Sequence, residues 1–151
     1  MIWCPRARRA RLALVAIAVT LCLCASAVRA ADGPAFFGEF STSDVIEADG
    51  LVTCTLTLRL TNQTGAALTA VAASLIDRGP LGTPFGAFQS FDAEDRVAVV
   101  VSGTFTVPSQ EFGTWRSGGQ PQVLLQFQAA DGTAVSTRAA LNPAVVPQGG
   151  R

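Results

Sequence analysis

The sequence predicts an all-β protein, an antiparallel sandwich of six or seven strands preceded by the helix of an N-terminal signal peptide. From residue 51 onward, apolar and polar residues alternate with period two, which is the pattern of strands with one buried face. Turn-forming residues separate these segments at the short spacing that a sandwich requires. No later stretch keeps an apolar helical stripe for three turns.

The first thirty residues have the three parts of a secretory signal peptide. Residues 6–11 contribute four arginines, residues 12–24 form an uncharged apolar run, and residues 28–30 provide a small-residue cleavage site. Thirteen residues in a helix span about 20 Å, short of the roughly 30 Å hydrocarbon core of a bilayer. We therefore predict cleavage after Ala30 rather than a permanent membrane anchor, with cleavage after Ala27 as the alternative.

Two other export routes fit less well. Leu21 and Leu23 precede Cys22 and Cys24, where a lipoprotein signal has a small residue. The twin arginine at residues 8–9 is followed by Ala and Arg, where the twin-arginine route prefers bulky apolar residues. The sequence thus predicts a secreted or periplasmic protein with no membrane contact after cleavage.

The mature chain is small and acidic. Cleavage leaves 121 residues, enough for one domain, which we place at residues 31–141, with residues 142–151 as a flexible tail. This mature part has six arginines and eleven acidic residues, a net charge of −5. Because such a surface repels phosphate backbones, nucleic acid is not an expected partner.

Residues 51–61 form the clearest predicted strand, with threonines on one face and apolar residues on the other. The apolar set is Val52, Cys54, Leu56, Leu58 and Leu60. Residues 62–65 then provide turn chemistry. Before this strand, residues 36–40 and 45–48 are predicted as one or two short strands, and a turn at residues 49–50 leads into it.

The next predicted strand is residues 68–76, followed by a long connection. Its inward set is Val71, Ala73 and Leu75. Leu68 breaks this alternation and suggests a bulge. Residues 78–92 contain three glycines, two prolines and three phenylalanines, so we predict a long connection there.

Three further strands are predicted in the second half. Residues 96–107 form the first, and residues 109–121 form a second long connection. The inward side chains of the first are Val97, Val99, Val101, Phe105 and Val107. Residues 122–129 and 134–141 form the last two, joined by an Asp-Gly hairpin turn at residues 131–132.

Three segments share features with a known family: residues 51–65 (LVTCTLTLRLTNQTG), 68–77 (LTAVAASLID) and 101–107 (VSGTFTV). One strand ends in a polar Asn/Thr/Gly turn and the next begins with Leu-Thr. Over residues 45–141 the chain resembles bacterial immunoglobulin-like and fibronectin-III-like modules of secreted and cell-surface proteins. It departs from them because Cys54 has no partner cysteine and no tyrosine is available for a tyrosine corner. The resemblance implies an immunoglobulin-like architecture and not an activity.

The mature chain lacks most of the side chains that catalysis requires. It has no His, Lys or Tyr, and Cys54 is its single cysteine. Strand parity places Cys54 in the core, where a thiol is inert and its pKa is raised; a reactive thiol or an intermolecular disulfide is the alternative. Zinc and copper sites are not expected without histidine. We predict that the protein is not an enzyme and has no cofactor.

Carboxylates are the remaining source of chemistry. Asp92, Glu94, Asp95 and Glu111 are candidates for a small glycoside hydrolase, which needs two carboxylates held opposite each other, but nothing in their spacing fixes such a pair. The first three are also a weak candidate site for Ca²⁺ between loops. The plainer interpretation is that all four are solvated loop residues.

Four aromatic residues, Phe85, Phe88, Phe91 and Trp115, are the candidate binding residues. They lie in the two long connections, where exposed rings could stack on sugars or anchor a protein partner. The alternative is that they cover an open end of the sandwich. Residues 62–64 match an N-glycosylation acceptor, a motif that is common by chance.

These observations predict an exported, non-catalytic β-sandwich module that binds a protein or a cell surface. An edge strand, or the loops at residues 78–95 and 109–121, would make the contact. A structural subunit of a surface assembly is one alternative function. A small carboxylate-dependent glycoside hydrolase is the other.

Overall fold

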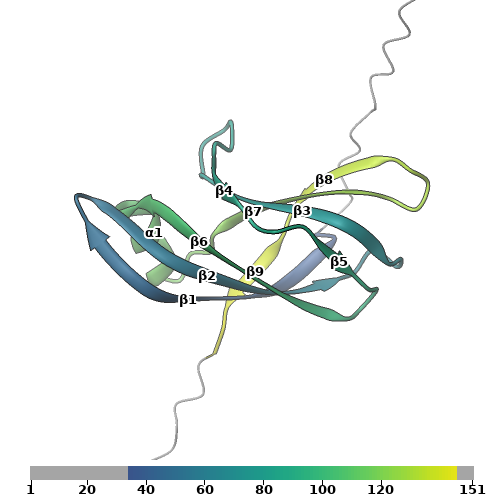
Figure 1. The fold of residues 1–151 in the computed structure, drawn as a ribbon, viewed down its shortest axis with the longest axis horizontal. Coiled ribbons are helices and arrows are strands. Elements are labelled where there is room, and N and C mark those ends of the chain that lie inside the picture. The colour runs from purple at the N-terminus through teal and green to yellow at the C-terminus, as the bar shows by residue number, and fades with distance from the viewer. Residues whose placement is uncertain (1–33, 146–151) are drawn as a thin grey trace, which may run out of the picture.

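Two facing β-sheets are formed by residues 34–145, the part of the chain that the computed structural model describes (Figure 1). The predicted signal peptide and its cleavage site at Ala30 lie outside the described residues. The elements are β1 (Phe36–Ala48), β2 (Leu51–Asn62), β3 (Leu68–Ile76), β4 (Pro84–Ala87), β5 (Phe91–Ala93), β6 (Ala98–Pro108), α1 (Ser109–Arg116), β7 (Gln122–Gln128), β8 (Ala134–Arg138) and β9 (Ala140–Pro143).

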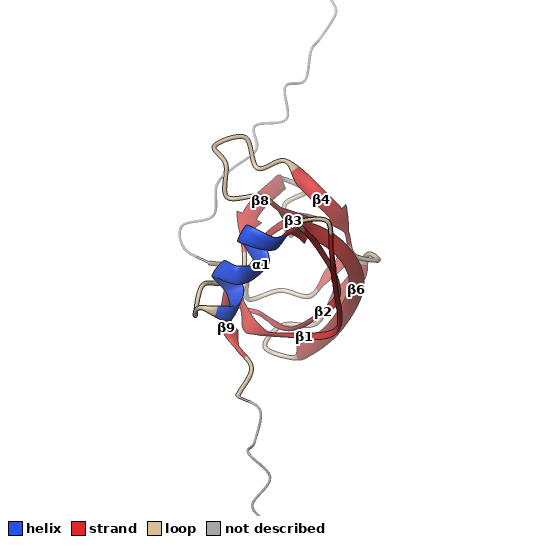
Figure 2. Cartoon of the chain, turned by 90° about the vertical axis from the view of Figure 1, so that its left-hand side faces the viewer, coloured by secondary structure: helices blue, strands red, loops and turns tan. Residues whose placement is uncertain are grey.

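The strand order separates the chain into two layers. One sheet has the order β6-β2-β1-β9, and the other has the order β4-β3-β7-β8, with the short β5 paired to β3. All neighbouring strands are antiparallel except β1 and β9, which are parallel. Viewed from the end, the strands surround a common interior and α1 lies at one end (Figure 2). The prediction of a mostly β protein with two sheets is therefore confirmed.

The core is made by the inward faces of both sheets. In β2 the five predicted apolar side chains are all buried, so the period-two pattern placed this strand correctly. Facing them from the other sheet are Val71, Ala73 and Leu75 of β3 and Val123 and Leu125 of β7, all buried as well. Because strand side chains alternate between faces, the opposite sides of these strands are left for solvent.

Backbone bulges explain two places where the alternation breaks. In β1, Asp44 and Val45 together oppose a single residue of β2, and Asp44 has a φ of 50°. The two short segments predicted before residue 49 are thus one bulged strand of 13 residues. In β3, Ala70 has a φ of 52°, and the bulge lets Leu68 and Val71 both face inward, which confirms the predicted bulge.

The two predicted connections contain regular structure that the sequence pattern missed. The first includes β4 and β5, and the second includes α1. Only Phe112 and Trp115 of α1 are buried, so the helix has too short an apolar stripe to be recognised by periodicity. Glu111 fixes this helix, since its Oε1 accepts hydrogen bonds from Trp115 Nε1 at 2.8 Å and Arg78 Nε at 3.1 Å.

The segment predicted as one final strand divides between the two sheets. β8 pairs with β7, the small buried residue Ala139 follows, and β9 then pairs with β1 in the opposite layer. The prediction that a flexible tail begins at residue 142 was wrong at its start, because Asn142 and Pro143 belong to β9. Residues 146–151 lie outside the described range.

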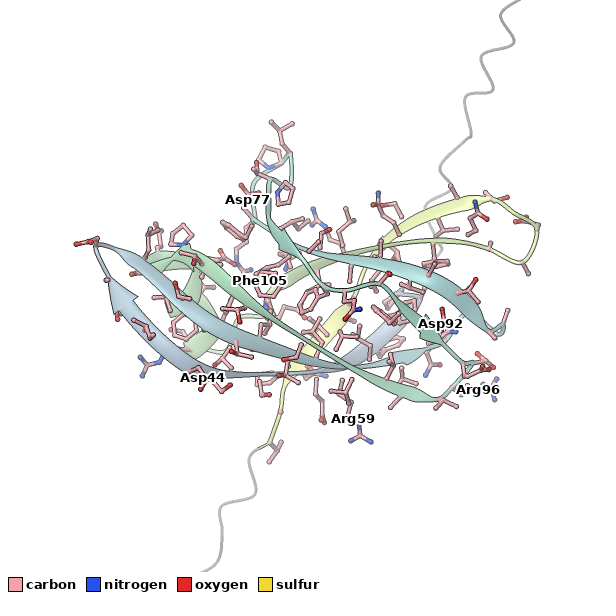
Figure 3. All side chains as sticks on the ribbon, viewed as in Figure 1. Asp44, Arg59, Asp77, Asp92, Arg96 and Phe105 are labelled. Atoms are coloured by element: carbon pink, nitrogen blue, oxygen red, sulfur yellow. The ribbon has the colours of Figure 1, made fainter. Side chains whose placement is uncertain are left out.

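The inward set predicted for residues 96–107 was partly wrong. Phe105 and Val107 are buried, whereas Val97 is 56% exposed and lies before β6 begins. Phe105 lies between the sheets (Figure 3) and packs on Phe88, with ring centroids 4.7 Å apart. Val99 and Val101 are only partly buried, so the first half of β6 is the less covered half.

Candidate binding surfaces

The four candidate binding aromatics contribute to the core rather than to an exposed surface. Phe88 and Trp115 are buried, and Phe85 and Phe91 are partly buried against the core. Trp115 contacts Phe112 edge-on at a centroid distance of 5.7 Å. A buried ring cannot stack on a sugar or enter a partner's pocket, so these positions agree with the alternative that the aromatics cover the sandwich.

Two of the three candidate Ca²⁺ ligands accept hydrogen bonds from the backbone. Asp92 Oδ1 accepts a hydrogen bond from Ala70 N at 2.9 Å, which gives the backbone N–H at the β3 bulge a partner. Asp95 Oδ1 accepts one from Gly65 N at 3.0 Å. Within residues 34–145 no group of three or more acidic, His or Cys side chains is placed to hold a metal ion. The geometry therefore gives no support to the weak Ca²⁺ site at Asp92, Glu94 and Asp95.

Asn62 is buried and holds together the end of the sandwich where β6 begins. Its side-chain nitrogen donates to Ala66 O at 2.8 Å and to Ala93 O at 2.9 Å, and its oxygen accepts from the Thr64 hydroxyl at 2.7 Å. Its backbone oxygen accepts from Arg96 N at 2.8 Å. A side chain in this position cannot receive a glycan, so the acceptor motif at residues 62–64 has a structural role.

Cys54 lies in the core as strand parity predicted. Its side chain is fully buried and forms no disulfide within the described residues. Burial removes the thiolate from water and raises the pKa of the Cys54 thiol. The thiol is therefore an apolar core group rather than a nucleophile.

The first exposed feature is the outer edge of β6. This eleven-residue strand ends its sheet, and its side away from β2 has no strand partner among the described residues. No charged residue occurs between Arg96 and Glu111, and residues 97–101 are all apolar. Val97 is 56% and Val100 63% exposed. Gly86 of β4 lies close to the Phe105 ring, and β5 also contacts β6, but neither strand pairs with it. Residues 98–102 include no buried side chain, so we define them as the open part of this edge.

The second exposed feature is the far half of β1. β9 pairs with β1 only over residues 37–40, which leaves residues 41–48 as the opposite free edge of the same sheet. This edge contains the bulge at Asp44 and a second carboxylate, Glu47. Charges and bulges are the devices that keep edge strands from pairing with other chains.

The third feature is a hollow on the outer face of the four-stranded sheet, with a volume of about 320 Å³. Its lining includes one exposed aromatic ring, one carboxylate, one guanidinium group and several neutral polar groups. The lining residues are Phe37, Gly38, Glu39, Arg59, Thr61, Gln63, Ala98 and Asn142. Arg59 points away from the core on this side of the molecule (Figure 3).

A larger groove of about 520 Å³ lies between the turn after β2 and the β7–β8 hairpin. Its walls include Ala35, Leu68, Phe127 and Val135, and Asp131 is its single carboxylate. The hollow likewise has a single carboxylate, Glu39. Neither space therefore has the two opposed carboxylates that the alternative hydrolase function requires.

Comparison with other proteins adds no functional information. No protein-family model matches the sequence, and no curated protein is significantly similar to it. Among solved structures, the solution structure of the CARDB domain of a Pyrococcus furiosus protein matches with a TM-score of 0.34 and 10% sequence identity, over 74% of this chain and 97% of that chain. Similarity at this level assigns neither family nor function. Within residues 34–145 no helix has the length and apolar character to cross a bilayer.

Proposed function

We propose that the protein is an exported, non-catalytic immunoglobulin-like module that binds another polypeptide by strand addition along β6. The observation that supports this most directly is the open, uncharged first half of that edge strand. Unpaired N–H and C=O groups on such an edge can form a ladder with an extended segment of another chain. Alternate side chains on the added strand would then set specificity.

The immunoglobulin-like part of the proposal is supported by the strand order. Labelled A to G along the chain, an immunoglobulin sandwich has neighbours A-B-E in one sheet and C-F-G in the other, with C′ beside C in variable-type domains. Here β1-β2-β6 corresponds to A-B-E, and β4-β3-β7-β8 corresponds to C′-C-F-G. The order agrees with the family resemblance of residues 45–141.

The chemistry of the edge defines the segment that fits it. Residues 97–101 are Val-Ala-Val-Val-Val, so the neighbouring side chains on an added strand would meet apolar, β-branched surfaces. An uncharged segment rich in Val, Ile, Thr or aromatic residues is the best match. We assign this segment to a different protein, because two copies of a domain with a net charge of −5 repel each other.

The test compares two charge substitutions at equally exposed positions on the two edges. Val100→Glu places a carboxylate opposite Arg59, and Ile46→Lys places an ammonium group near Asp44 and Glu47, so neither change introduces like-charge repulsion. Wild type and both variants are immobilised and presented with proteins of the exported fraction. We expect a partner that the wild type and Ile46→Lys retain equally and that Val100→Glu binds about fivefold more weakly.

Two results would contradict this proposal. Equal retention by all three proteins would show that β6 is not the contact. Recovery of the protein's own copies alone, together with a native mass that is a multiple of the chain mass, would favour the structural-subunit alternative.

A further inference from the structure

We infer that the outer hollow of the four-stranded sheet is a binding site for a neutral oligosaccharide. The hollow meets the polypeptide contact along β6 at Ala98, which belongs to both. Its main groups Phe37 and Glu39 lie on β1, two strands away from that edge, so either proposal can fail without the other. Its volume of about 320 Å³ falls at the lower end of small-molecule sites. It accordingly suits one or two sugar rings of a longer chain lying across the sheet.

The register of the strands brings the lining residues together. Phe37 of β1 is opposite Thr61 of β2, which is opposite Ala98 of β6. In the next row on the same face, Glu39 lies between Arg59 of β2 and Asn142 of β9. The two rows are held by hydrogen-bonded strands rather than by loops, so the groups are fixed in position before a ligand arrives.

Among residues 34–145, the polar side chains of the hollow form no hydrogen bonds with one another or with neighbouring groups, unlike those farther along the same face. Thr53 and Thr106 pair through their hydroxyls at 2.9 Å, and Thr57 and Ser102 do so at 2.8 Å. By contrast, Glu39 and Arg59 oppose each other directly, yet within the described residues they form no ion pair and no side-chain hydrogen bond. The side chains of Gln63 and Asn142 also make none, so the hollow retains free donors and acceptors of both kinds.

This combination of groups matches the chemistry of a sugar. The Phe37 ring is 45% exposed and offers an apolar face to the C–H side of a pyranose. A guanidinium group, a carboxylate and two amides can bind pairs of neighbouring hydroxyls, which both donate and accept. Because the single carboxylate and the single guanidinium balance, the hollow favours an uncharged ligand over an anionic or cationic one.

The inference is tested by titrating the isotope-labelled protein with cellotetraose, chitotetraose and maltotetraose, using tetragalacturonate as an anionic comparison. We expect one neutral tetrasaccharide to shift the amide resonances of residues 37–39, 59–63 and 142. Phe37→Ala and Arg59→Gln should each weaken its binding about tenfold, since each removes one of the main contacts. Both side chains are exposed, so neither change should unfold the protein.

Matched substitutions outside the hollow serve as controls. Leu81→Ala removes an apolar side chain that is 92% exposed, and Arg138→Gln removes an exposed strand arginine of the other sheet. Both should bind the saccharide as the wild type does. The inference is overturned if no neutral tetrasaccharide shifts these resonances at millimolar concentration, if Phe37→Ala and Arg59→Gln bind as well as the controls, or if tetragalacturonate binds as tightly.

Discussion

The two free edges of one sheet differ in almost every property that governs strand pairing. The far half of β1, residues 41–48, is exposed throughout, contains a bulge at Asp44 and has two carboxylates. The open half of β6 is regular and uncharged, and its residues 98–101 are alanine and β-branched valines. Both edges have unpaired backbone groups, so the difference lies in whether another strand can approach them.

An edge strand can be protected by its backbone as much as by its side chains. At β1 the bulge interrupts the regular spacing of N–H and C=O groups, and the carboxylates must stay in water. At β6 neither obstacle is present over residues 98–102, which is why we place the polypeptide contact there.

The largest effect is expected where the β6 edge is anchored. Asn62→Ala removes the side-chain hydrogen bonds that join the end of β2 to Ala66 and Ala93. Ala66 O keeps the Thr64 hydroxyl as a donor, whereas Ala93 O loses the donor from Asn62. We expect the free energy of unfolding to fall by about 3 kcal/mol, measured by urea denaturation. As a control, Asn142 is an exposed asparagine of β9, and Asn142→Ala should change the free energy of unfolding by less than about 0.5 kcal/mol. Equal effects would contradict the anchoring role.

A smaller effect is expected where β6 passes over the core. A Cβ on Gly103 would lie 2.8 Å from a ring atom of Phe105 and 3.4 Å from one of Phe88, so Gly103→Ala forces these two packed rings to move. We expect a loss of about 2 kcal/mol in urea denaturation. Gly113→Ala in α1 meets open space and should be neutral or stabilise by up to about 1 kcal/mol. If Gly103→Ala left the free energy of unfolding unchanged, the space beside Gly103 would not be filled by the Phe105 and Phe88 rings.

A third prediction compares the edges in the absence of a partner. Val100→Glu and Ile46→Lys should each alter the free energy of unfolding by less than about 0.5 kcal/mol, because both side chains are exposed. When salt screens the repulsion between copies, their effects on self-association should differ, since only β6 offers a regular apolar edge. We expect Val100→Glu to lengthen the lag before fibrillar aggregation and Ile46→Lys to leave it unchanged. A longer lag for Ile46→Lys alone would place the exposed pairing edge on β1.

The smallest effect concerns β2, the strand between the two edges. Burial raises the pKa of Cys54 above the ordinary thiol value of 9.0, so the unfolded chain loses this proton at a lower pH than the folded one. The stabilising contribution of the neutral thiol is complete below pH 9.0 and declines as the pH rises above it. No Lys or Tyr titrates in this range. Urea denaturation should therefore show stability falling above that pH in the wild type and a flatter profile in Cys54→Ala.

Local pattern was enough to predict much of the fold. The alternation in residues 51–61 identified the buried face of β2, and the Asp49-Gly50 turn is present with positive φ at both residues. Leu68 indicated the bulge in β3. These features depend on neighbouring residues alone, which is why the sequence contains them.

Long-range pairing explains what could not be predicted. The division of the last segment at Ala139 depends on β9 finding β1, about a hundred residues earlier in the chain. The hollow depends on the register of four strands, so Phe37, Arg59 and Asn142 share no local pattern. The position of the four aromatics in long connections predicts that they are available for binding. Their burial depends on contacts with the opposite sheet, such as that of Phe88 with Phe105, which local pattern does not contain.

Backbone hydrogen exchange measured on the two edges tests the central claim most directly. The amides of residues 97–102 and of residues 41–48 are followed in the protein alone and in its complex with the protein captured from the exported fraction. Strand addition along β6 predicts that exchange slows at residues 97–102 and stays unchanged at residues 41–48. Slower exchange at residues 41–48, or no change at either edge, would contradict it.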